Sequence, residues 1–274
     1  MRPVVLITGS SQGIGKALAR QFGRHGYAVM LNARRAERLE ATRAELTTDG
    51  LTVAALAGDI SDAAFAAELV AHTVETFGQL NVLINNAGAA NRGPVAEVAP
   101  ESVRTLVEVN LMGTIFPTQA ALPHLRATQG SVLFVSSLAG LHGLPFNGLY
   151  SSTKQALTAL TESLRLEERP NGVHVGIAYV GFTQNDPEKI ILDTDGTPIY
   201  LPRRKGLRLQ APQKVAATLY DMVRRRRDRR VLTLMGRGLA LAQRFFPRVI
   251  DWVLQRNLDQ VRAQSEGEAK RVKP

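Results

Sequence analysis

The run Pro3-Val4-Val5-Leu6-Ile7 is followed at once by Thr8-Gly9-Ser10-Ser11-Gln12-Gly13-Ile14-Gly15, and residues 16–22 then have their apolar side chains at helical spacing. The first run predicts a short buried strand. A strand, a glycine-rich turn and a helix in this order aim backbone N–H groups and a helix N-terminus at a pyrophosphate. Glycine is needed where the chain turns tightly against phosphates. The spacing is T-G-x-x-x-G-x-G rather than G-x-G-x-x-G, and the alternative is an ordinary strand–helix turn.

The alternation of strand and helix continues along the chain. Further apolar runs predict strands at Ala28–Asn32, Leu51–Leu56, Asn81–Ile84, Ser131–Val135, Val173–Tyr179 and Arg230–Leu234. A long helical pattern covers Pro100–Arg126, and Ser61 is the expected N-cap of the helix after the third strand. Strands that are apolar throughout indicate an α/β fold, with a doubly wound parallel sheet covered by helices on both faces. Ligands bind where such strands end, and the residues found there are Gly9, Arg34, Asp59, Asn86, Ser137 and Gly181.

The segment from Ser136 to Lys154 carries residue types suited to proton transfer. Tyr150 and Lys154 are four residues apart, so on a helix they share one face. A nearby ammonium favours the phenolate and brings the tyrosine closer to use as a general acid or base. Ser137 lies thirteen residues before Tyr150 and offers a hydroxyl to the same substrate oxygen. The pattern predicts proton transfer at an alcohol oxygen while a hydride moves at the carbon, although an isolated Tyr-x-x-x-Lys is usually a solvated pair.

The end of the second strand bears on the choice of nicotinamide cofactor. An acidic residue near this point binds the ribose 2′-hydroxyl of NAD, whereas arginine suits the 2′-phosphate of NADP. Here Ala33 stands where the acid is expected, and Arg34 and Arg35 follow. A guanidinium is well shaped for phosphate, so the sequence predicts NADP(H). The alternative is an arginine at a helix start that faces solvent.

Composition sets broader limits. The 274 residues include no cysteine, which excludes disulfides and thiolate metal sites, and no metal site is predicted. Neither a signal peptide nor a membrane-spanning run is recognisable, so a cytoplasmic location is expected. Residues 201–274 hold 19 Lys and Arg against 6 Asp and Glu, and they carry the whole basic excess of the chain. Such asymmetry suits nucleic acid or an anionic membrane, but the basic segment lacks interleaved aromatics, so no nucleic-acid partner is expected.

Taken in order, these motifs resemble the short-chain dehydrogenase/reductase family in its single-domain form. The resemblance covers residues 3 to about 235 and rests on Thr8–Gly15, Asp59, Asn85–Gly88, Asn110, and Ser137 with Tyr150 and Lys154. It implies a Rossmann-like sheet of seven strands, a nicotinamide cofactor, a ketone or aldehyde interconverted with an alcohol, and a homodimer or homotetramer.

The resemblance also implies residue roles. Tyr150 is the general acid/base, Ser137 orients the substrate oxygen, Lys154 holds the nicotinamide ribose, and Asn110 positions a water in a proton relay. The cofactor-binding set that it implies, together with the turn residues, is Thr8, Gly9, Ser11, Gly13, Ile14, Gly15, Arg34, Asp59, Ile60, Asn86, Ala87, Gly88, Tyr150, Lys154 and Gly181.

One stretch departs from the family pattern. Relatives carry Pro-Gly-x-x-x-Thr after the sixth strand, and here Val180 and Asn185 replace the proline and the threonine. Asn185 retains the ability to hydrogen-bond a carboxamide. Apolar residues suggest a hydrophobic or lipid-like substrate, although a core role explains several of them equally well: Leu138, Leu144, Phe146, Phe182 and Ile190. A non-catalytic NADP-binding regulator on the same fold is the alternative function, and nucleic-acid binding through the tail is a weaker one.

Two later segments complete the expectations. Residues 181–210 show no pattern, which is typical of a lid or binding loop. We divide the chain into a catalytic domain, 1–235, and a basic amphipathic extension, 236–274, that is not an independent domain. Within the extension, Pro247 is expected to start one helix with an apolar face made by Ile250, Val253, Leu254, Leu258 and Val261. Residues 239–262 would then lie on an anionic membrane or pack against protein.

Overall fold

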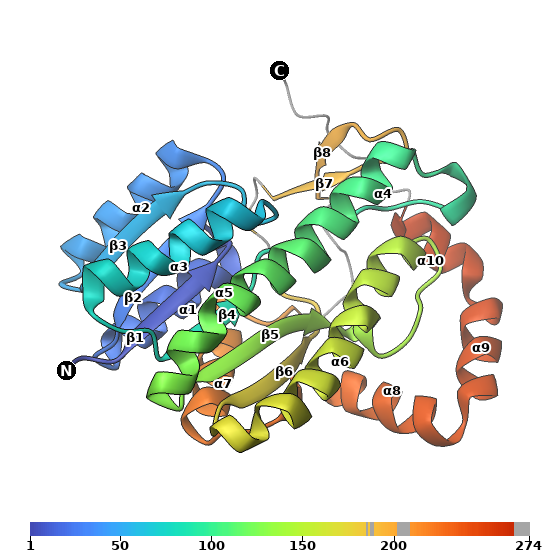
Figure 1. Ribbon diagram of the computed structural model, residues 1–274. Coiled ribbons are helices and arrows are strands. Elements are labelled where there is room, and N and C mark those ends of the chain that lie inside the picture. The colour runs from blue at the N-terminus through green and yellow to red at the C-terminus, as the bar shows by residue number, and fades with distance from the viewer. Residues whose placement is uncertain (185, 187–188, 202–208, 266–274) are drawn as a thin grey trace.

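A computed structural model describes residues 1–184, 186, 189–201 and 209–265, with side chains up to residue 262. Seven parallel strands form one sheet in the order β3-β2-β1-β4-β5-β6-β9, which confirms the predicted fold class (Figure 1). The strands are β1 Val4–Thr8, β2 Ala28–Ala33, β3 Val53–Ala57, β4 Val82–Asn85, β5 Ser131–Ser137, β6 His174–Val180 and β9 Arg229–Val231.

Helices cover both faces of this sheet. The elements are α1 Gly13–Arg24, α2 Ala36–Thr48, α3 Ala63–Phe77, α4 Pro100–Val107, α5 Gly113–Thr128, α6 Gly148–Glu168, α7 Pro212–Arg224, α8 Leu234–Phe245, α9 Pro247–Arg256 and α10 Leu258–Ser265. Short 3₁₀ turns are η1 Val95–Glu97, η3 Leu138–Gly140 and η4 Arg169–Asn171. Side chains alternate across β1, so that Val4 and Leu6 join the core under α3, α5 and α6, while Val5 and Ile7 join the core under α1, α2 and α7. Burial on both sides explains why the strands read as continuous apolar runs.

The helix predicted over Pro100–Arg126 has the expected extent but contains a π-helical turn, η2 (Glu108–Met112), between α4 and α5. The wider turn lies at Asn110, whose side chain is fully buried. Such turns are often found at functional positions, and the sequence analysis did not predict this π-helical turn.

Three local predictions were wrong. The N-cap of α3 is Asp62, whose carboxylate accepts the Phe65 amide at 2.9 Å, while the Ser61 hydroxyl donates to Asp59 instead. The last strand stops at Val231, and Leu234 begins α8. The tail is not one helix beyond Pro247, because α9 ends at Arg256 and α10 starts at Leu258. Its five apolar residues therefore do not share one face: Ile250 is buried, Leu254 and Val261 are half-buried, and Val253 and Leu258 are exposed.

The segment after β6 was expected to be an unpatterned lid, but it contains an antiparallel hairpin of β7 (Ile190–Leu192) and β8 (Pro198–Tyr200). The hairpin is fastened to the loop after β4: the Leu192 amide donates to the Ala90 carbonyl at 2.9 Å, and the Arg92 guanidinium pairs with Asp193 at 3.1 Å. Asn185 and the basic residues Arg203, Arg204 and Lys205 lie outside the described residues.

Candidate active site

Thr8 joins the ends of two neighbouring strands beneath the glycine-rich turn. Its buried hydroxyl oxygen accepts the backbone amides of Asn86 and Ala87 at 3.1 and 3.0 Å. In return, the Asn86 side-chain amide donates to the carbonyls of Thr8 and Gly9 at 3.0 and 2.9 Å. These reciprocal hydrogen bonds satisfy buried backbone groups where β1 and β4 end side by side. They hold the glycine-rich turn and the loop after β4 in a fixed relative position.

The three glycines of the turn are required for different reasons: Gly9 and Gly15 for space, and Gly13 for its backbone conformation. A Cβ on Gly9 would approach the Ala87 Cα to 2.8 Å, and one on Gly15 would approach the Gly9 carbonyl oxygen to 2.2 Å, so both positions are closed to side chains. Gly13 has φ +54° and open space where a Cβ would lie. The N-terminus of α1 at Gly13 thus combines unobstructed backbone with a helix dipole, which is the setting that accepts a phosphate. Ser11 and Ile14, the other predicted turn residues, are half-buried there.

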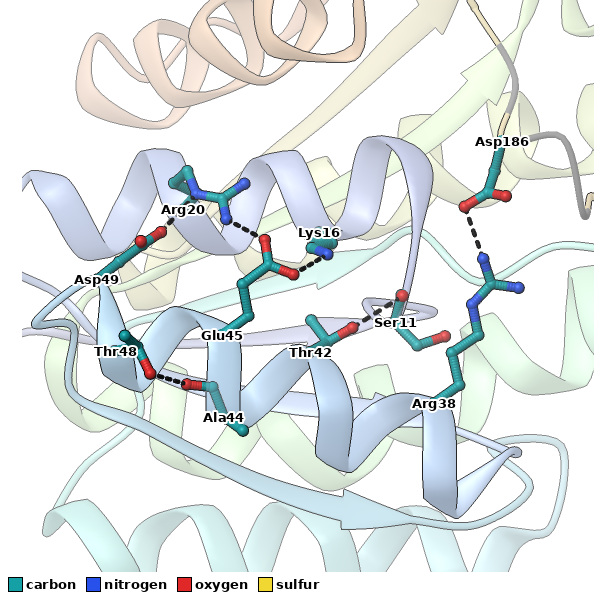
Figure 2. A network of polar contacts seen from close by, with 10 residues as sticks. All are labelled: Ser11, Lys16, Arg20, Arg38, Thr42, Ala44, Glu45, Thr48, Asp49 and Asp186. Atoms are coloured by element: carbon teal, nitrogen blue, oxygen red, sulfur yellow. Dashed lines mark hydrogen bonds and ion pairs between the residues drawn. The ribbon is translucent and has the colours of Figure 1, made fainter.

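Three residues to which the sequence analysis gave no role, Ser10, Asn32 and Thr42, hold the turn against β2 and α2. The Asn32 amide donates to the buried Ser10 hydroxyl oxygen at 2.9 Å, and the Asn32 side chain donates to the carbonyls of Leu56 and Gly58 at 3.2 and 3.3 Å. The Thr42 hydroxyl on α2 donates to the Ser11 carbonyl at 3.0 Å (Figure 2). Serine and asparagine after apolar strands gave no distinct signal, because the partners lie far apart in sequence.

Arg34 and Asp59 lie together beyond the ends of β2 and β3. Partial burial raises the pKa of the Asp59 carboxyl, but hydrogen bonds from Ser61 and the charge of Arg34 outweigh burial and hold this pKa below its usual value. Arg34 itself is exposed and follows Ala33, the last residue of β2. An exposed guanidinium here, with no acid at Ala33, provides the charge and shape that a 2′-phosphate requires. Ile60 is buried against Gly113, so its side chain contributes to the wall of the site by packing.

An ion pair links α2 to the segment after β6. The Arg38 guanidinium reaches Asp186 at 2.6 Å, and Figure 2 shows it standing apart from the α1–α2 contacts of Lys16, Arg20, Glu45 and Asp49. Both partners are about one-quarter exposed. The pair connects residues 148 positions apart, and no local pattern could have predicted it.

Lys154 is a buried charged residue of the site. Its side chain is 5% exposed and its Nζ donates to the Val135 carbonyl at 3.3 Å. Burial, together with the charge of Lys189, lowers the pKa of Lys154 from 10.5 to about 8. The Nζ lies 5.9 Å from the centre of the Tyr150 ring, so the predicted pair does share one side of α6. A buried ammonium this close to a phenol stabilises negative charge on the phenol.

Asn110 is brought to the same place by the π-helical turn. Its side chain pairs with both backbone groups of Ala89, at 2.9 and 3.0 Å, and donates to the Thr153 hydroxyl at 3.0 Å. Gly88 lies between, because a Cβ there would be 3.2 Å from the Asn110 Oδ1 and 3.3 Å from the Lys154 Nζ. The loop after β4 is thus clamped to α6. The side-chain amide of Asn110 is used in this clamp, and a water-positioning role stays a prediction.

Ser137 ends β5, and its hydroxyl oxygen accepts the Ala139 amide at 3.3 Å as the next turn begins. The neighbouring Ser136 is buried, and its hydroxyl donates to the Lys154 carbonyl at 3.1 Å. Ser136 therefore anchors α6 to β5, which leaves Ser137 as the serine that ends the strand. The two serines thus have distinct structural positions, and the role of Ser136 as an anchor was not predicted.

The apolar residues predicted to form a substrate pocket divide into two groups. Leu138 is a core residue, 7% exposed, whereas Leu144, Phe146, Phe182 and Ile190 are half-buried. A cavity of about 400 Å³ opens beside this region and is lined by His142, Gly143, Leu144, Pro145, Asp251, Leu254, Gln255 and Leu258. Ser137, Tyr150 and Lys154 are not among its lining residues, so this cavity adjoins the candidate active site and is not identical with it. Gly181 follows β6, where a Cβ would meet Thr233.

The residues at the carboxyl edge fit a nicotinamide dinucleotide. The open Gly13 turn suits the pyrophosphate, Asp59 and Arg34 lie at the end of β2 and β3 where a ribose and adenine would rest, and the buried ammonium of Lys154 lies by Tyr150 at the other end. Among the described residues, no group of three or more His, Asp or Glu side chains gathers as a metal site would require.

Comparisons with known proteins agree with this geometry. The family model described as short chain dehydrogenase matches residues 3–194. The chain is 37% identical over 184 residues to "11-beta-hydroxysteroid dehydrogenase-like 4A" of Arabidopsis thaliana, an alignment that covers 66% of this chain and 61% of that protein. The match thus spans only about three-fifths of the length of that relative.

Solved structures extend the likeness. An alcohol dehydrogenase from the archaeon Thermococcus sibiricus, complexed with 5-hydroxy-NADP, superposes with a TM-score of 0.74 and 28% identity, covering 84% of this chain and 95% of that one. A short-chain dehydrogenase from Streptomyces avermitilis shares the fold over 96% of this chain and 98% of its own, with a TM-score of 0.78 and 24% identity. The family predicted from the ordered motifs is confirmed, and the chain belongs to the short-chain dehydrogenase/reductase family of oxidoreductases.

Proposed function

We propose that the protein is an NADP(H)-dependent oxidoreductase that interconverts a ketone or aldehyde with an alcohol on an apolar substrate. The observation that carries this proposal is the buried Lys154 ammonium beside the Tyr150 ring, on the helix that follows Ser137. Burying an ammonium is costly, and buried charges with strongly shifted pKa values cluster at functional sites. Membership of the oxidoreductase family supports the same reaction class.

In this proposal the bound nicotinamide supplies the hydride to the carbonyl carbon, or accepts it from the alcohol. The Tyr150 hydroxyl donates a proton to the substrate oxygen during reduction and takes it back during oxidation. Lys154 stabilises the phenolate that remains, and its ammonium also suits the hydroxyls of the nicotinamide ribose. The Ser137 hydroxyl orients the substrate oxygen, and Asn110, by clamping the loop after β4 to α6, holds Gly88 and Lys154 in place.

The choice of NADP(H) rests on Arg34. The guanidinium is exposed at the end of β2, where Ala33 stands in place of an acid. Its positive charge helps to lower the pKa of Asp59. The solved relative from Thermococcus sibiricus was crystallised with an NADP derivative, which supports the same preference. An apolar substrate is supported by the half-buried Leu144, Phe146 and Phe182.

Assembly, boundaries and location are further parts of the proposal. We infer a homodimer or homotetramer, as is usual for the family, and a catalytic unit over residues 1–235 with 236–274 as its extension. In the part of the chain that the structure describes, none of the helices combines the length and the hydrophobicity that a bilayer span requires. We also propose peripheral contact with an anionic membrane through residues 239–262, because α8 and α9 expose apolar side chains and arginines there.

The test is Tyr150→Phe, assayed with NADPH and a panel of short-chain, long-chain and polycyclic ketones. Removing the proton donor should lower kcat by about 10²–10⁴-fold and leave NADPH binding nearly unchanged, because such groups contribute rate and not affinity. Tyr27→Phe is a matched control, since Tyr27 is half-buried and packs on Phe22 far from Lys154. A Tyr150→Phe enzyme with wild-type turnover would sink the assignment.

A further inference from the structure

Helices α8 and α9 present apolar side chains to solvent. Leu234, Leu241 and Phe245 are 82%, 63% and 60% exposed, and their spacing of i, i+7 and i+11 places them along one side of α8. Trp252 and Val249 continue the exposed surface on α9. We call this surface the apolar stripe; it consists of Leu234, Leu241, Phe245, Phe246, Val249, Trp252 and Val253. Most of the exposed large apolar side chains in the described chain belong to it.

The opposite sides of the two helices face the protein through Ile250, which is buried, through the half-buried Leu239 and Leu254, and through polar contacts. The Gln243 side chain meets the His142 Nδ1 at 2.7 Å, and the Asp251 carboxylate lies 3.8 Å from the His142 Nε2. Gly236 is buried against Leu138, where a Cβ would come within 2.4 Å of the leucine. A surface helix normally turns its apolar side to the core and its polar side to water. Helix α8 has a second apolar side in solvent, formed by Leu234, Leu241 and Phe245, and the packing of the described chain does not explain that side.

Charge identifies the partner that this stripe fits. Residues 234–257 contain four arginines, Arg237, Arg244, Arg248 and Arg256, against the single acid Asp251. All four arginines are exposed, and the Arg256 guanidinium lies 5.3 Å from the centre of the Trp252 ring. The Asp251 carboxylate lies 3.8 Å from the His142 Nε2 and is itself 61% exposed. The two helices that carry the stripe therefore expose four positive charges against one negative charge.

We propose that the apolar stripe docks on an anionic membrane surface, with Phe245, Phe246 and Trp252 in the acyl boundary and the arginines among the headgroups. Aromatic and aliphatic side chains bordered by arginine are the combination that such an interface stabilises. A second copy of the chain fits less well, because a two-fold interface would place four arginines against four arginines across the stripe. The docking does not depend on the proposed reductase activity.

The docking face lies close to the candidate active site. The arm formed by α8, α9 and α10 runs along the outer side of the molecule (Figure 1). On its inner side, α9 and α10 line the 400 Å³ cavity together with His142–Pro145, a loop that lies between Ser137 and Tyr150 in the chain. The Arg262 guanidinium also lies 5.3 Å from the Phe146 ring. A membrane-bound arm would thus hold this cavity near the lipid surface.

The chain contains one tryptophan, Trp252, so its fluorescence reports on the stripe without a label. Full-length protein is mixed with vesicles of phosphatidylcholine alone or with about one-third phosphatidylglycerol, and binding is followed by flotation and by the Trp252 emission. We expect flotation and a blue shift with the anionic vesicles, and a loss of both at high salt, because charges at a membrane surface are screened within a Debye length.

Two variants and two controls separate the contributions. Leu241→Ser with Phe245→Ser should lower the partition coefficient by about 100-fold, since each side chain leaves the acyl boundary. Arg244→Gln with Arg248→Gln should lower it about 25-fold, about fivefold for each charge. Leu166→Ser, on an equally exposed leucine of α6, and Arg24→Gln with Arg104→Gln should bind as wild type.

Three outcomes would overturn the proposal. The protein could ignore anionic vesicles, or bind neutral and anionic vesicles equally. A blue shift that grows with protein concentration in the absence of lipid, together with a larger mass in solution that the stripe variant loses, would show that a second copy covers the stripe. Turnover is not part of this readout, so failure here leaves the proposed reaction untouched, and failure of the Tyr150→Phe test leaves the docking untouched.

Discussion

The buried ammonium of Lys154 should make the protein less stable than it would be with a neutral side chain at this position. Replacing Lys154 by Met keeps the length of the side chain and removes the charge. The substitution should abolish turnover under the proposed function and yet raise the free energy of unfolding of the cofactor-free protein. The charge on the Lys154 Nζ is thus needed for the proposed activity and lowers the free energy of unfolding.

The magnitude follows from the contacts of Lys154. A pKa lowered from 10.5 to about 8 corresponds to about 3 kcal/mol of destabilisation of the charged folded state at pH 7. The lost hydrogen bond from Nζ to the Val135 carbonyl, 3.3 Å long, offsets about 1 kcal/mol of this gain. The expected net effect of Lys154→Met is therefore a gain of about 2 kcal/mol, or a rise in Tm of about 4–8 °C for a domain of this size.

The pH dependence fixes the origin of the effect. Between pH 8 and 10.5 the folded protein has released the Lys154 proton while the unfolded chain still holds it, so the stability of the wild type rises with pH in this window. The advantage of Lys154→Met should be constant below pH 8 and disappear as the pH approaches 10.5. Urea unfolding followed by circular dichroism measures the stability gain of Lys154→Met at pH 7 and its decrease at pH 10.

A control variant guards against a general effect of losing a lysine. Lys214→Met replaces an exposed lysine of α7 and should change the free energy of unfolding by less than about 0.5 kcal/mol at either pH. The reasoning is refuted if Lys154→Met lowers stability at pH 7, or if its difference from the wild type stays the same up to pH 10.5.

Three further substitutions probe the cofactor side. Arg34→Ala should raise the KM for NADPH about tenfold or more and leave that for NADH almost unchanged, because only NADPH carries the 2′-phosphate; equal effects on both would contradict the assignment. Thr8→Val should lower the free energy of unfolding by about 2–4 kcal/mol, because two backbone amides lose their acceptor, whereas Thr161→Val, equally buried but only a donor to Leu157, should cost less than about 1 kcal/mol. Gly13→Ala and Gly26→Ala carry similar backbone strain at positive φ with open space around the Cβ, about 1–2 kcal/mol in thermal unfolding, and only Gly13→Ala should weaken NADPH binding in a titration.

Local sequence patterns predict the elements whose signal lies within a few neighbouring residues. Continuous apolar runs at 4–7 and 132–135 are strands because both faces of the sheet are covered, and the tight turn after Thr8 needs glycine because a Cβ on Gly9 would meet Ala87. The spacing of Tyr150 and Lys154 placed them on one side of a helix for the same reason, since one turn of helix is a fixed repeat. The family and the sheet could therefore be predicted before any coordinates.

Contacts between distant segments could not be predicted from local patterns and are known from the folded chain. The hydroxyl of Thr8 meets amides 78 and 79 residues away, and Arg38 pairs with a carboxylate 148 residues away, because strand order and not sequence distance brings them together. The docked hairpin, the π-helical turn at Asn110 and the break after Arg256 also have no local signature. Helical periodicity gave α8 an apolar side but not its direction. That direction is outward because Gly236 and Gln243, on the other side, make the close contacts with Leu138 and His142.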